Sequence, residues 1–207
     1  MSAPEFRRWF QDNGDHTRLL DHDLNEKSVV FDIGGYTGEF TDDIFNKFGC
    51  NVYVFEPVQK FYSQLCERFD ENNKVRIFNY GLATENIQSS INIDMANGEN
   101  TSILDRKIIE SVQSEKIFLK KIEDVFAEHE LEQVDLISMN IEGGEYELLK
   151  HLVTSPVIFK IKNIQVQFHD FIDNARTKRD ILHIKLQNTH KLTYNYDFVW
   201  ENWKRRE

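Results

Sequence analysis

Residues 29–38, Val-Val-Phe-Asp-Ile-Gly-Gly-Tyr-Thr-Gly, constrain the fold more than any other part of this chain. The apolar run 29–33 is typical of a short buried strand, and the glycines after it predict a tight turn. An amphipathic stretch, 39–48, then indicates a helix. A strand, a glycine turn and a helix in this order form the nucleotide pocket of α/β proteins, at the carboxyl end of a parallel sheet.

The glycine turn itself argues against a dinucleotide. A dinucleotide fingerprint counted from Gly34 needs two further glycines, at positions that Tyr36 and Glu39 occupy in this chain. The tyrosine ring would keep a pyrophosphate away from the backbone, and the carboxylate would repel phosphate from the helix N-terminus. An NAD-dependent oxidoreductase is therefore disfavoured.

Two acidic residues favour another ligand. Asp32 lies at the end of the first predicted strand, and Glu56 directly follows the second, 51–55. Carboxylate oxygens accept hydrogen bonds from vicinal ribose hydroxyls and attract cations. S-adenosylmethionine has a ribose diol, a cationic sulfonium and no phosphate. The acids and the close glycine backbone together predict S-adenosylmethionine as the cofactor of a methyltransferase.

The predicted cofactor site extends to the third and fourth strands. Asn79, at the end of the third strand, and Leu82 would supply an amide and an apolar wall for adenine, although an ordinary strand exit explains them nearly as well. Asp32 would order the glycine loop or contact the amino-acid end of the cofactor; capping of the turn is its alternative. The full predicted set is Asp32, Gly34, Gly35, Tyr36, Thr37, Gly38, Glu56, Pro57, Asn79, Gly81, Leu82 and Asn140.

The catalytic candidates follow the fourth and fifth strands. Glu142 lies at the pocket mouth, where a polar side chain costs stability unless it is used. His169 ends the fifth strand and titrates near neutral pH, so we expect it to be the general base, with Glu142 orienting it or the substrate. A structural role is the alternative for a lone histidine. Glu145 and Glu147 are explained by the N-terminus of the following helix and are not assigned to catalysis.

The remaining pattern predicts a single α/β domain, 1–207, with a helical preamble at 1–27. Strands are expected at 29–33, 51–55, 75–79, 134–139 and 161–168, and helices at 38–49, 58–70, 121–130, 143–153 and 175–187. A hairpin and an irregular loop are expected within 84–115, and two antiparallel strands within 190–203. Together these give a mostly parallel, Rossmann-like seven-stranded sheet with helices on both faces and an antiparallel C-terminal hairpin. The region 84–115 and the Trp200–Trp203 end are candidates for the acceptor wall.

Composition restricts the partners. The net charge of −10 argues against a general electrostatic grip on nucleic acid or on an anionic membrane. No segment has the roughly 20 apolar residues of a membrane span, and the N-terminus lacks a signal-peptide core, so a soluble cytoplasmic protein is expected. Cys50 and Cys66 lack metal-ligand spacing, and no metal site is predicted. The oligomeric state is left open.

Three motifs make the chain similar to the FkbM family of S-adenosylmethionine-dependent methyltransferases. They are Asp32-Ile-Gly-Gly-Tyr-Thr-Gly38, Phe55-Glu56-Pro57 and Asn140-Ile-Glu-Gly-Gly-Glu145, and the resemblance covers residues 28–170. It implies the class I methyltransferase fold and O-methylation of a sugar, a polysaccharide or glycolipid precursor, or a related natural product.

Two departures from the family pattern remove carboxylates from the pocket rim. Asn140 and Gln167 stand where the family usually has acids, and both changes weaken the case for a bound divalent cation. They also support the alternative of a degenerate cofactor-binding relative without transferase activity. The intact glycine loop and His169 argue for the active enzyme.

Overall fold

The computed structural model describes residues 3–94, 101–102 and 112–207. The helices are α1 (Ala3–Gln11), α2 (Gly14–Thr17), α3 (Glu39–Phe48), α4 (Gln59–Arg68), α5 (Ile122–Glu128), α6 (Glu145–Leu152) and α7 (Ala175–Leu186), with a 3₁₀ turn η1 (Pro156–Lys160). The strands are β1 (Val29–Ile33), β2 (Asn51–Phe55), β3 (Val75–Phe78), β4 (Gly81–Ala83), β5 (Ile87–Asp94), β6 (Thr101–Ser102), β7 (Val112–Lys121), β8 (Leu136–Met139), β9 (Asn163–Val166), β10 (His190–Tyr196) and β11 (Trp200–Arg205).

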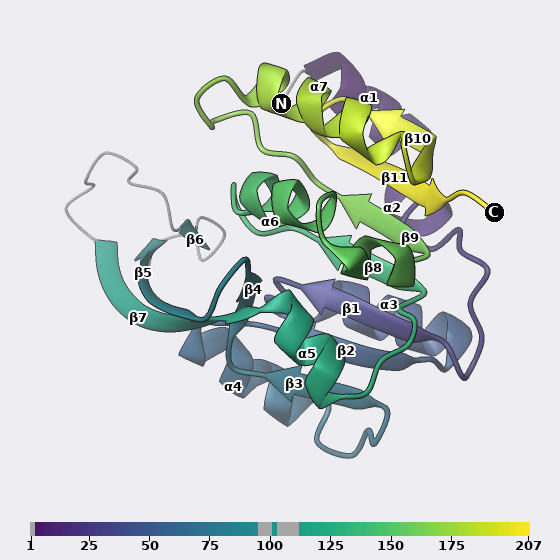
Figure 1. The fold of residues 1–207 in the computed structure, drawn as a ribbon. Coiled ribbons are helices and arrows are strands. Elements are labelled where there is room, and N and C mark those ends of the chain that lie inside the picture. The colour runs from purple at the N-terminus through teal and green to yellow at the C-terminus, as the bar shows by residue number, and fades with distance from the viewer. Residues whose placement is uncertain (1–2, 95–100, 103–111) are drawn as a thin grey trace.

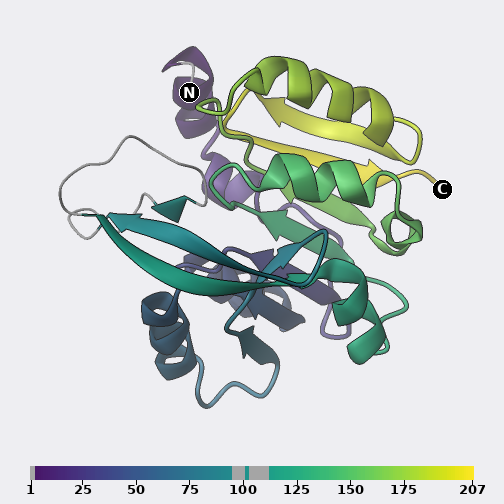
Figure 2. The same ribbon diagram turned by 60° about the vertical axis from the view of Figure 1, so that its left-hand side comes forward.

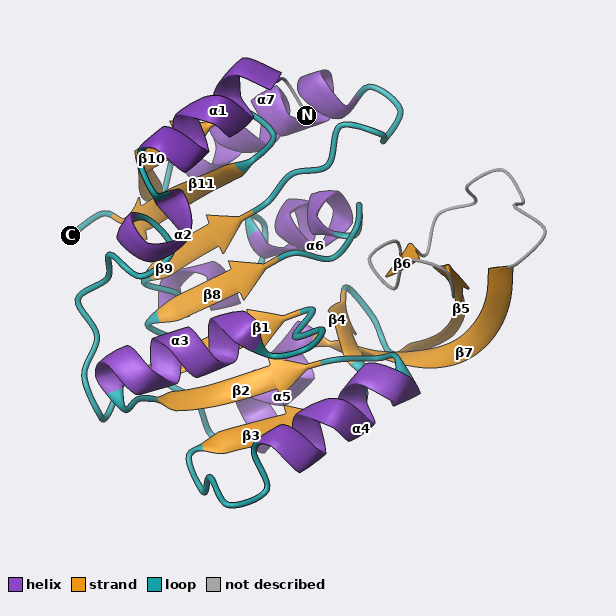
Figure 3. Ribbon diagram, turned by 180° about the vertical axis from the view of Figure 1, so that it is seen from behind, coloured by secondary structure: helices purple, strands orange, loops and turns teal. Residues whose placement is uncertain are grey.

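A seven-stranded sheet carries the fold, in the order β10-β11-β9-β8-β1-β2-β3 (Figures 1 and 3). Strands β1, β2, β3, β8 and β9 run parallel, whereas β11 pairs antiparallel with both β9 and β10. The predicted mostly parallel sheet with an antiparallel C-terminal hairpin is confirmed. The strand order reverses direction at β1, so the ends of β1, β2 and β8 meet where α/β proteins bind ligands.

Helices cover both faces of this sheet because successive side chains of each strand point to opposite sides. Val30 packs in an apolar cluster with Ile44 of α3 and Leu65 of α4. The next residue, Phe31, belongs to the larger cluster on the other face, to which α5, α6 and α7 contribute. Figure 1 shows α5, α6 and α7 in front of the sheet.

The N-terminal segment is less helical than the predicted preamble. Helix α1 ends at Gln11, and Asn13 adopts a left-handed conformation with φ 51° before the single turn of α2. Gly14 then passes so close to the indole of Trp9 that a Cβ there would lie 2.2 Å from a ring carbon. This close packing turns the chain, and α1 rests through Trp9 on Tyr194 and Tyr196 of β10.

A second, four-stranded sheet has the order β4-β7-β5-β6 and stands at the carboxyl ends of the parallel strands (Figures 2 and 3). Strand β5 pairs antiparallel with β6, the next strand in the chain, which confirms the hairpin expected within 84–115, and β5 also pairs antiparallel with β7 along its whole length. Strand β4 extends this sheet by parallel pairing with β7. The remainder of the predicted irregular loop, 95–100 and 103–111, lies outside the described residues.

Candidate active site

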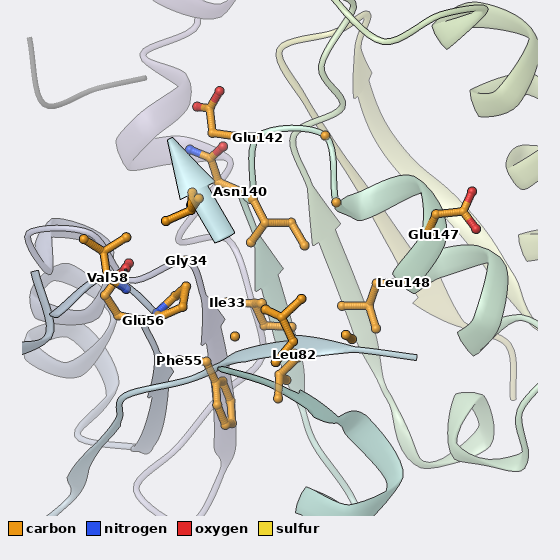
Figure 4. A pocket seen from close by; sticks show the side chains of 18 of the residues that line it. Ile33, Gly34, Phe55, Glu56, Val58, Leu82, Asn140, Glu142, Glu147 and Leu148 are labelled. Atoms are coloured by element: carbon orange, nitrogen blue, oxygen red, sulfur yellow. Dashed lines mark hydrogen bonds between the residues drawn. The ribbon is translucent and has the colours of Figure 1, made fainter. Parts of the chain in front are cut away.

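A cavity of about 520 Å³ opens at the carboxyl ends of β1, β2 and β8 (Figure 4). The second sheet, through Ile91 and Leu119, and helix α6, through Leu148, supply its other walls. The predicted cofactor residues that line it are Gly34, Tyr36, Glu56, Pro57, Gly81, Leu82 and Asn140, and the catalytic candidate Glu142 lines it as well.

The glycine loop lies against the end of β8. Backbone hydrogen bonds continue past the strands: Gly34 N donates to Phe55 O at 2.9 Å, and Asn140 N donates to Ile33 O at 3.1 Å. At Gly34, with φ 87°, a Cβ would be 2.3 Å from the Asn140 carbonyl oxygen. Only glycine fits between the two strand ends. Because the chain packs this closely at Gly34, the glycine loop and the turn after β8 line the same cavity.

Gly38 ends the loop with φ 90° and starts α3. A Cβ at this position would lie 2.8 Å from Leu65 and 2.9 Å from Phe69, both in α4 or its cap. We expect Gly38→Val to lower the free energy of unfolding by about 2–4 kcal/mol, from overpacking together with the left-handed backbone, and to weaken cofactor binding. Urea unfolding followed by circular dichroism measures this loss.

Gly49→Ala is the matched control for Gly38→Val. Gly49 also has a left-handed backbone, with φ 60°, but no atom lies within 4 Å of its would-be Cβ. Its substitution measures only the cost of a side chain on a left-handed backbone, on the order of 1 kcal/mol of unfolding free energy. Equal losses for the two variants would show that contact with α4 does not matter at Gly38.

Glu56 is buried at the cavity wall and holds the backbone around it. Its carboxylate accepts hydrogen bonds from Tyr36 N at 2.9 Å and from Val58 N at 2.8 Å. Burial raises the pKa of Glu56 to about 7, against the lowering effect of these two donors. The carboxylate is thus oriented before any ligand arrives, with Pro57 beginning the turn into α4.

Five of the predicted cofactor residues, Gly38 at the end of the loop among them, lie beside the cavity and do not line it. Asp32 is buried and accepts a hydrogen bond of 2.6 Å from the Thr41 hydroxyl, which ties β1 to α3. Burial raises the pKa of Asp32 to about 6, although Thr41 acts in the opposite direction. Gly35 packs where a Cβ would be 2.2 Å from Val54. The Thr37 hydroxyl donates to Glu39.

Asn79, the fifth of these residues, supports the cavity wall from behind. Its amide nitrogen donates to the carbonyl oxygens of Glu56 at 3.2 Å and Pro57 at 3.3 Å. These bonds fix the turn between β2 and α4. The side chain of Asn79 therefore acts on the backbone under the cavity wall.

The turn after β8 forms the rim. Asn140 is exposed, and Glu142 has a left-handed backbone with φ 51° followed by Gly143 at φ 104°. This bend turns the chain sharply into α6, and Figure 4 shows the side chains of Asn140 and Glu142 on the same rim. Gln167 does not line the cavity; its backbone N–H donates to Met139 O at 3.0 Å.

His169 lies behind that rim, only 9% exposed, and does not itself line the cavity. Its Nδ1 is 3.0 Å from Glu145 Oε1, and its Nε2 is 3.5 Å from Glu142 Oε1. Burial lowers the pKa of His169, but the two carboxylates outweigh burial and raise it to about 9. The expectation of an unperturbed histidine is therefore wrong: the imidazole carries a proton at neutral pH.

Two features of the site differ from what the sequence predicted. Glu145, assigned there to the helix N-terminus alone, is fully buried against His169. The Trp200–Trp203 end was expected to form an acceptor wall, but Trp203 is 0% exposed and its indole N–H donates to Glu201 in the core. Ile91, which lies in the other predicted candidate region, 84–115, does line the cavity, together with Leu119.

The residues present fit S-adenosylmethionine. Glu56 offers oriented oxygens for the ribose diol, Phe55 and Leu82 offer apolar faces for adenine, and the buried acids favour a cation. Within residues 3–94, 101–102 and 112–207, no group of three His, Cys, Asp or Glu side chains is placed to hold a metal ion. No helix of the described chain is long and apolar enough to span a bilayer.

Comparisons with known proteins agree with this reading. The fold is similar to a putative rRNA-methylase from Clostridium thermocellum, with TM-score 0.56, 11% identity, and 94% of this chain and 95% of that one covered. An rRNA methylase from Streptococcus thermophilus has a TM-score of 0.53 and 11% identity, with 94% of this chain and 95% of that one covered. The METTL16 MTase domain has a TM-score of 0.54 and 10% identity, with 97% of this chain and 68% of that one covered. No curated protein matches the sequence. The family model for the methyltransferase FkbM domain matches residues 32–196, and the chain therefore belongs to the FkbM family of S-adenosylmethionine-dependent methyltransferases.

Proposed function

We propose that this enzyme methylates a hydroxyl group of a sugar, of a polysaccharide or glycolipid precursor, or of a related natural product. The observation that carries the proposal is an imidazole held directly behind the rim of the cofactor cavity, between the buried Glu145 and Glu142, which lines the cavity. A hydroxyl is a poor nucleophile until its proton leaves, so a histidine beside the cavity suits an O-methyltransferase. The net charge of −10 favours a carbohydrate over an RNA acceptor, although rRNA methylases share the fold.

The chain's own residues would divide the work as follows. Glu56 would hold the ribose hydroxyls, and the glycine loop would let the cofactor approach the backbone closely. When bound, S-adenosylmethionine supplies an electrophilic methyl group, whose carbon–sulfur bond breaks as the bond to the acceptor oxygen forms. His169 would take the hydroxyl proton at Nε2, and Glu142 would orient the imidazole or the acceptor. The fixed cavity contributes by holding the acceptor in line.

An acceptor screen tests the proposal. Purified protein is incubated with methyl-labelled S-adenosylmethionine and with nucleotide sugars, oligosaccharides or rRNA fragments, while calorimetry compares S-adenosylhomocysteine with NADH. We expect heat only with the sulfur ligand and label only in the carbohydrates. Label in RNA would overturn the acceptor class. Tight cofactor binding with no turnover on any acceptor would favour the degenerate relative that Asn140 and Gln167 suggest.

We predict that turnover needs no divalent metal. Asn140 places an amide on the rim where family members usually carry an acid, and an amide binds divalent cations more weakly than a carboxylate. The initial rate should stay the same after dialysis against EDTA and after addition of magnesium. A rate that falls in EDTA and returns with magnesium would contradict this.

We also propose that the chain works in the cytoplasm as a single domain. Both cysteines are free, Cys50 buried and Cys66 partly so, which is consistent with a reducing compartment.

A further inference from the structure

Glu145 is a carboxylate with no access to solvent. Its relative exposure is 0%, and it is the first residue of α6. Carboxylates are seldom fully buried unless every oxygen is hydrogen-bonded, because desolvation of a charge is costly. The partners of Glu145 therefore show what this side chain is for.

Three N–H groups converge on that carboxylate. Oε2 accepts from Gly143 N at 2.8 Å, within the turn after β8. Oε1 accepts from the His169 backbone N at 2.9 Å and lies 3.0 Å from Nδ1 of the same histidine. One side chain thus joins the rim turn to both the backbone and the ring of His169.

A glutamine could not replace these bonds. If its oxygen faced His169, its NH₂ group would face the N–H of Gly143; if the amide were flipped, its NH₂ group would face the N–H of His169. Either way one donor meets another donor. The three-donor arrangement is specific to a carboxylate.

The position of the ring is fixed from other sides as well. The Tyr146 hydroxyl donates to His169 O at 2.8 Å, and the Phe171 ring lies 5.2 Å from the imidazole, centroid to centroid. With Nδ1 on Glu145, the other nitrogen, Nε2, points to Glu142 on the cavity rim. The hydrogen bond made by one ring nitrogen decides which nitrogen keeps the proton in the neutral ring.

We propose that Glu145 is a positioning residue, which keeps the His169 proton on Nδ1 and presents Nε2 as the proton acceptor on the cavity rim. The inference rests on the base assigned to His169 in the proposed function. It goes beyond that assignment by naming the group that sets the tautomer. Among the residues that the structure describes, Glu145 and Glu142 are the carboxylates paired with the ring, and they differ in role because Glu142 lines the cavity and Glu145 does not.

The test is nitrogen-15 NMR of the imidazole in the full-length protein, titrated with and without S-adenosylhomocysteine. In the wild type we expect the neutral ring to be protonated on Nδ1 and its pKa to lie near 9. In Glu145→Gln the proton should shift to Nε2 or divide between the nitrogens, and the pKa should fall. The kcat should drop by on the order of 10²–10⁴, as for a lost carboxylate partner of a catalytic histidine, with the KM for cofactor changed about twofold or less.

Glu123→Gln is the matched control, because Glu123 pairs with His151 at 2.6 Å in a carboxylate–histidine pair that does not line the cavity. It should leave the His169 spectrum and the kcat unchanged. If Glu145→Gln does not fold, the tautomer of His169 in the wild type tests the role of Glu145 without the variant. A neutral ring protonated on Nε2 in the wild type, or an unchanged tautomer in a folded Glu145→Gln, would overturn the role of Glu145. The expected tautomer together with full turnover in His169→Ala would support the placement by Glu145 and overturn the base assignment instead.

Discussion

Replacing His169 with alanine should lower turnover by on the order of 10²–10⁴, the usual effect of removing a general base, and should leave the affinity for S-adenosylhomocysteine within a few-fold. The difference arises because His169 lies behind the Glu142 rim and not among the residues that line the cofactor cavity. Steady-state rates with the acceptor found in the screen, and calorimetry with S-adenosylhomocysteine, measure the two effects separately.

The pH profile gives the same prediction a second readout. The pKa of His169 is raised to about 9, so the proton-accepting form is scarce at neutral pH and grows as the pH rises. The wild-type rate should therefore increase up to about pH 9 and then level, and this rise should be absent in His169→Ala. His151→Ala, in the other carboxylate–histidine pair, should keep both rate and profile. Full turnover in His169→Ala would transfer the role of base to Glu142.

Replacing Glu56 with alanine should weaken the binding of S-adenosylhomocysteine by on the order of 10²–10⁴. The ribose hydroxyls of the ligand would lose two charge-assisted hydrogen bonds to the Glu56 carboxylate, each worth about 1.5–3 kcal/mol. The change would also leave the N–H groups of Tyr36 and Val58 without their acceptor. Calorimetry at pH 8 measures the affinity.

The affinity of the wild type should itself depend on pH through Glu56. Its pKa is raised to about 7, so the carboxylate is ionised above that pH and protonated below it. A protonated carboxyl accepts fewer hydrogen bonds, and the dissociation constant should rise as the pH falls below about 7. Glu128→Gln, a change in an exposed ion pair with Lys120, is the control and should bind normally. Normal affinity for S-adenosylhomocysteine in a folded Glu56→Ala would show that Glu56 does not bind the cofactor.

The parts of the fold that sequence predicted are those determined by local pattern. The apolar run of β1 and the glycines after it predicted a strand and turn, and the structure shows why: Gly34 faces a carbonyl oxygen that no side chain could approach. The helix starting at Glu145 was likewise expected from its acidic first turn. These features depend on residues near one another in the chain.

The parts that were missed depend on which strands become neighbours. Glu145 has a sufficient local explanation at a helix N-terminus, and only the pairing of β8 with β9 brings His169 to it. The raised pKa of His169 follows from that pairing and could not be read from the histidine alone. From the sequence, Trp203 could have stacked on an acceptor, but its position in β11 buries it in the core.

The origin of the cavity walls has a consequence for how specificity can change. The predicted cofactor residues that line the cavity follow β1, β2 and β8 or lie in β4, whereas Ile91 and Leu119 reach the cavity from β5 and β7 of the second sheet. Substitutions in β5 and β7 alter one side of the cavity and leave the parallel strands, the turn at Glu56 and Leu82 of β4 in place. Acceptor specificity can therefore change through substitutions in β5 and β7, in evolution or by design, while the residues proposed to bind S-adenosylmethionine stay the same.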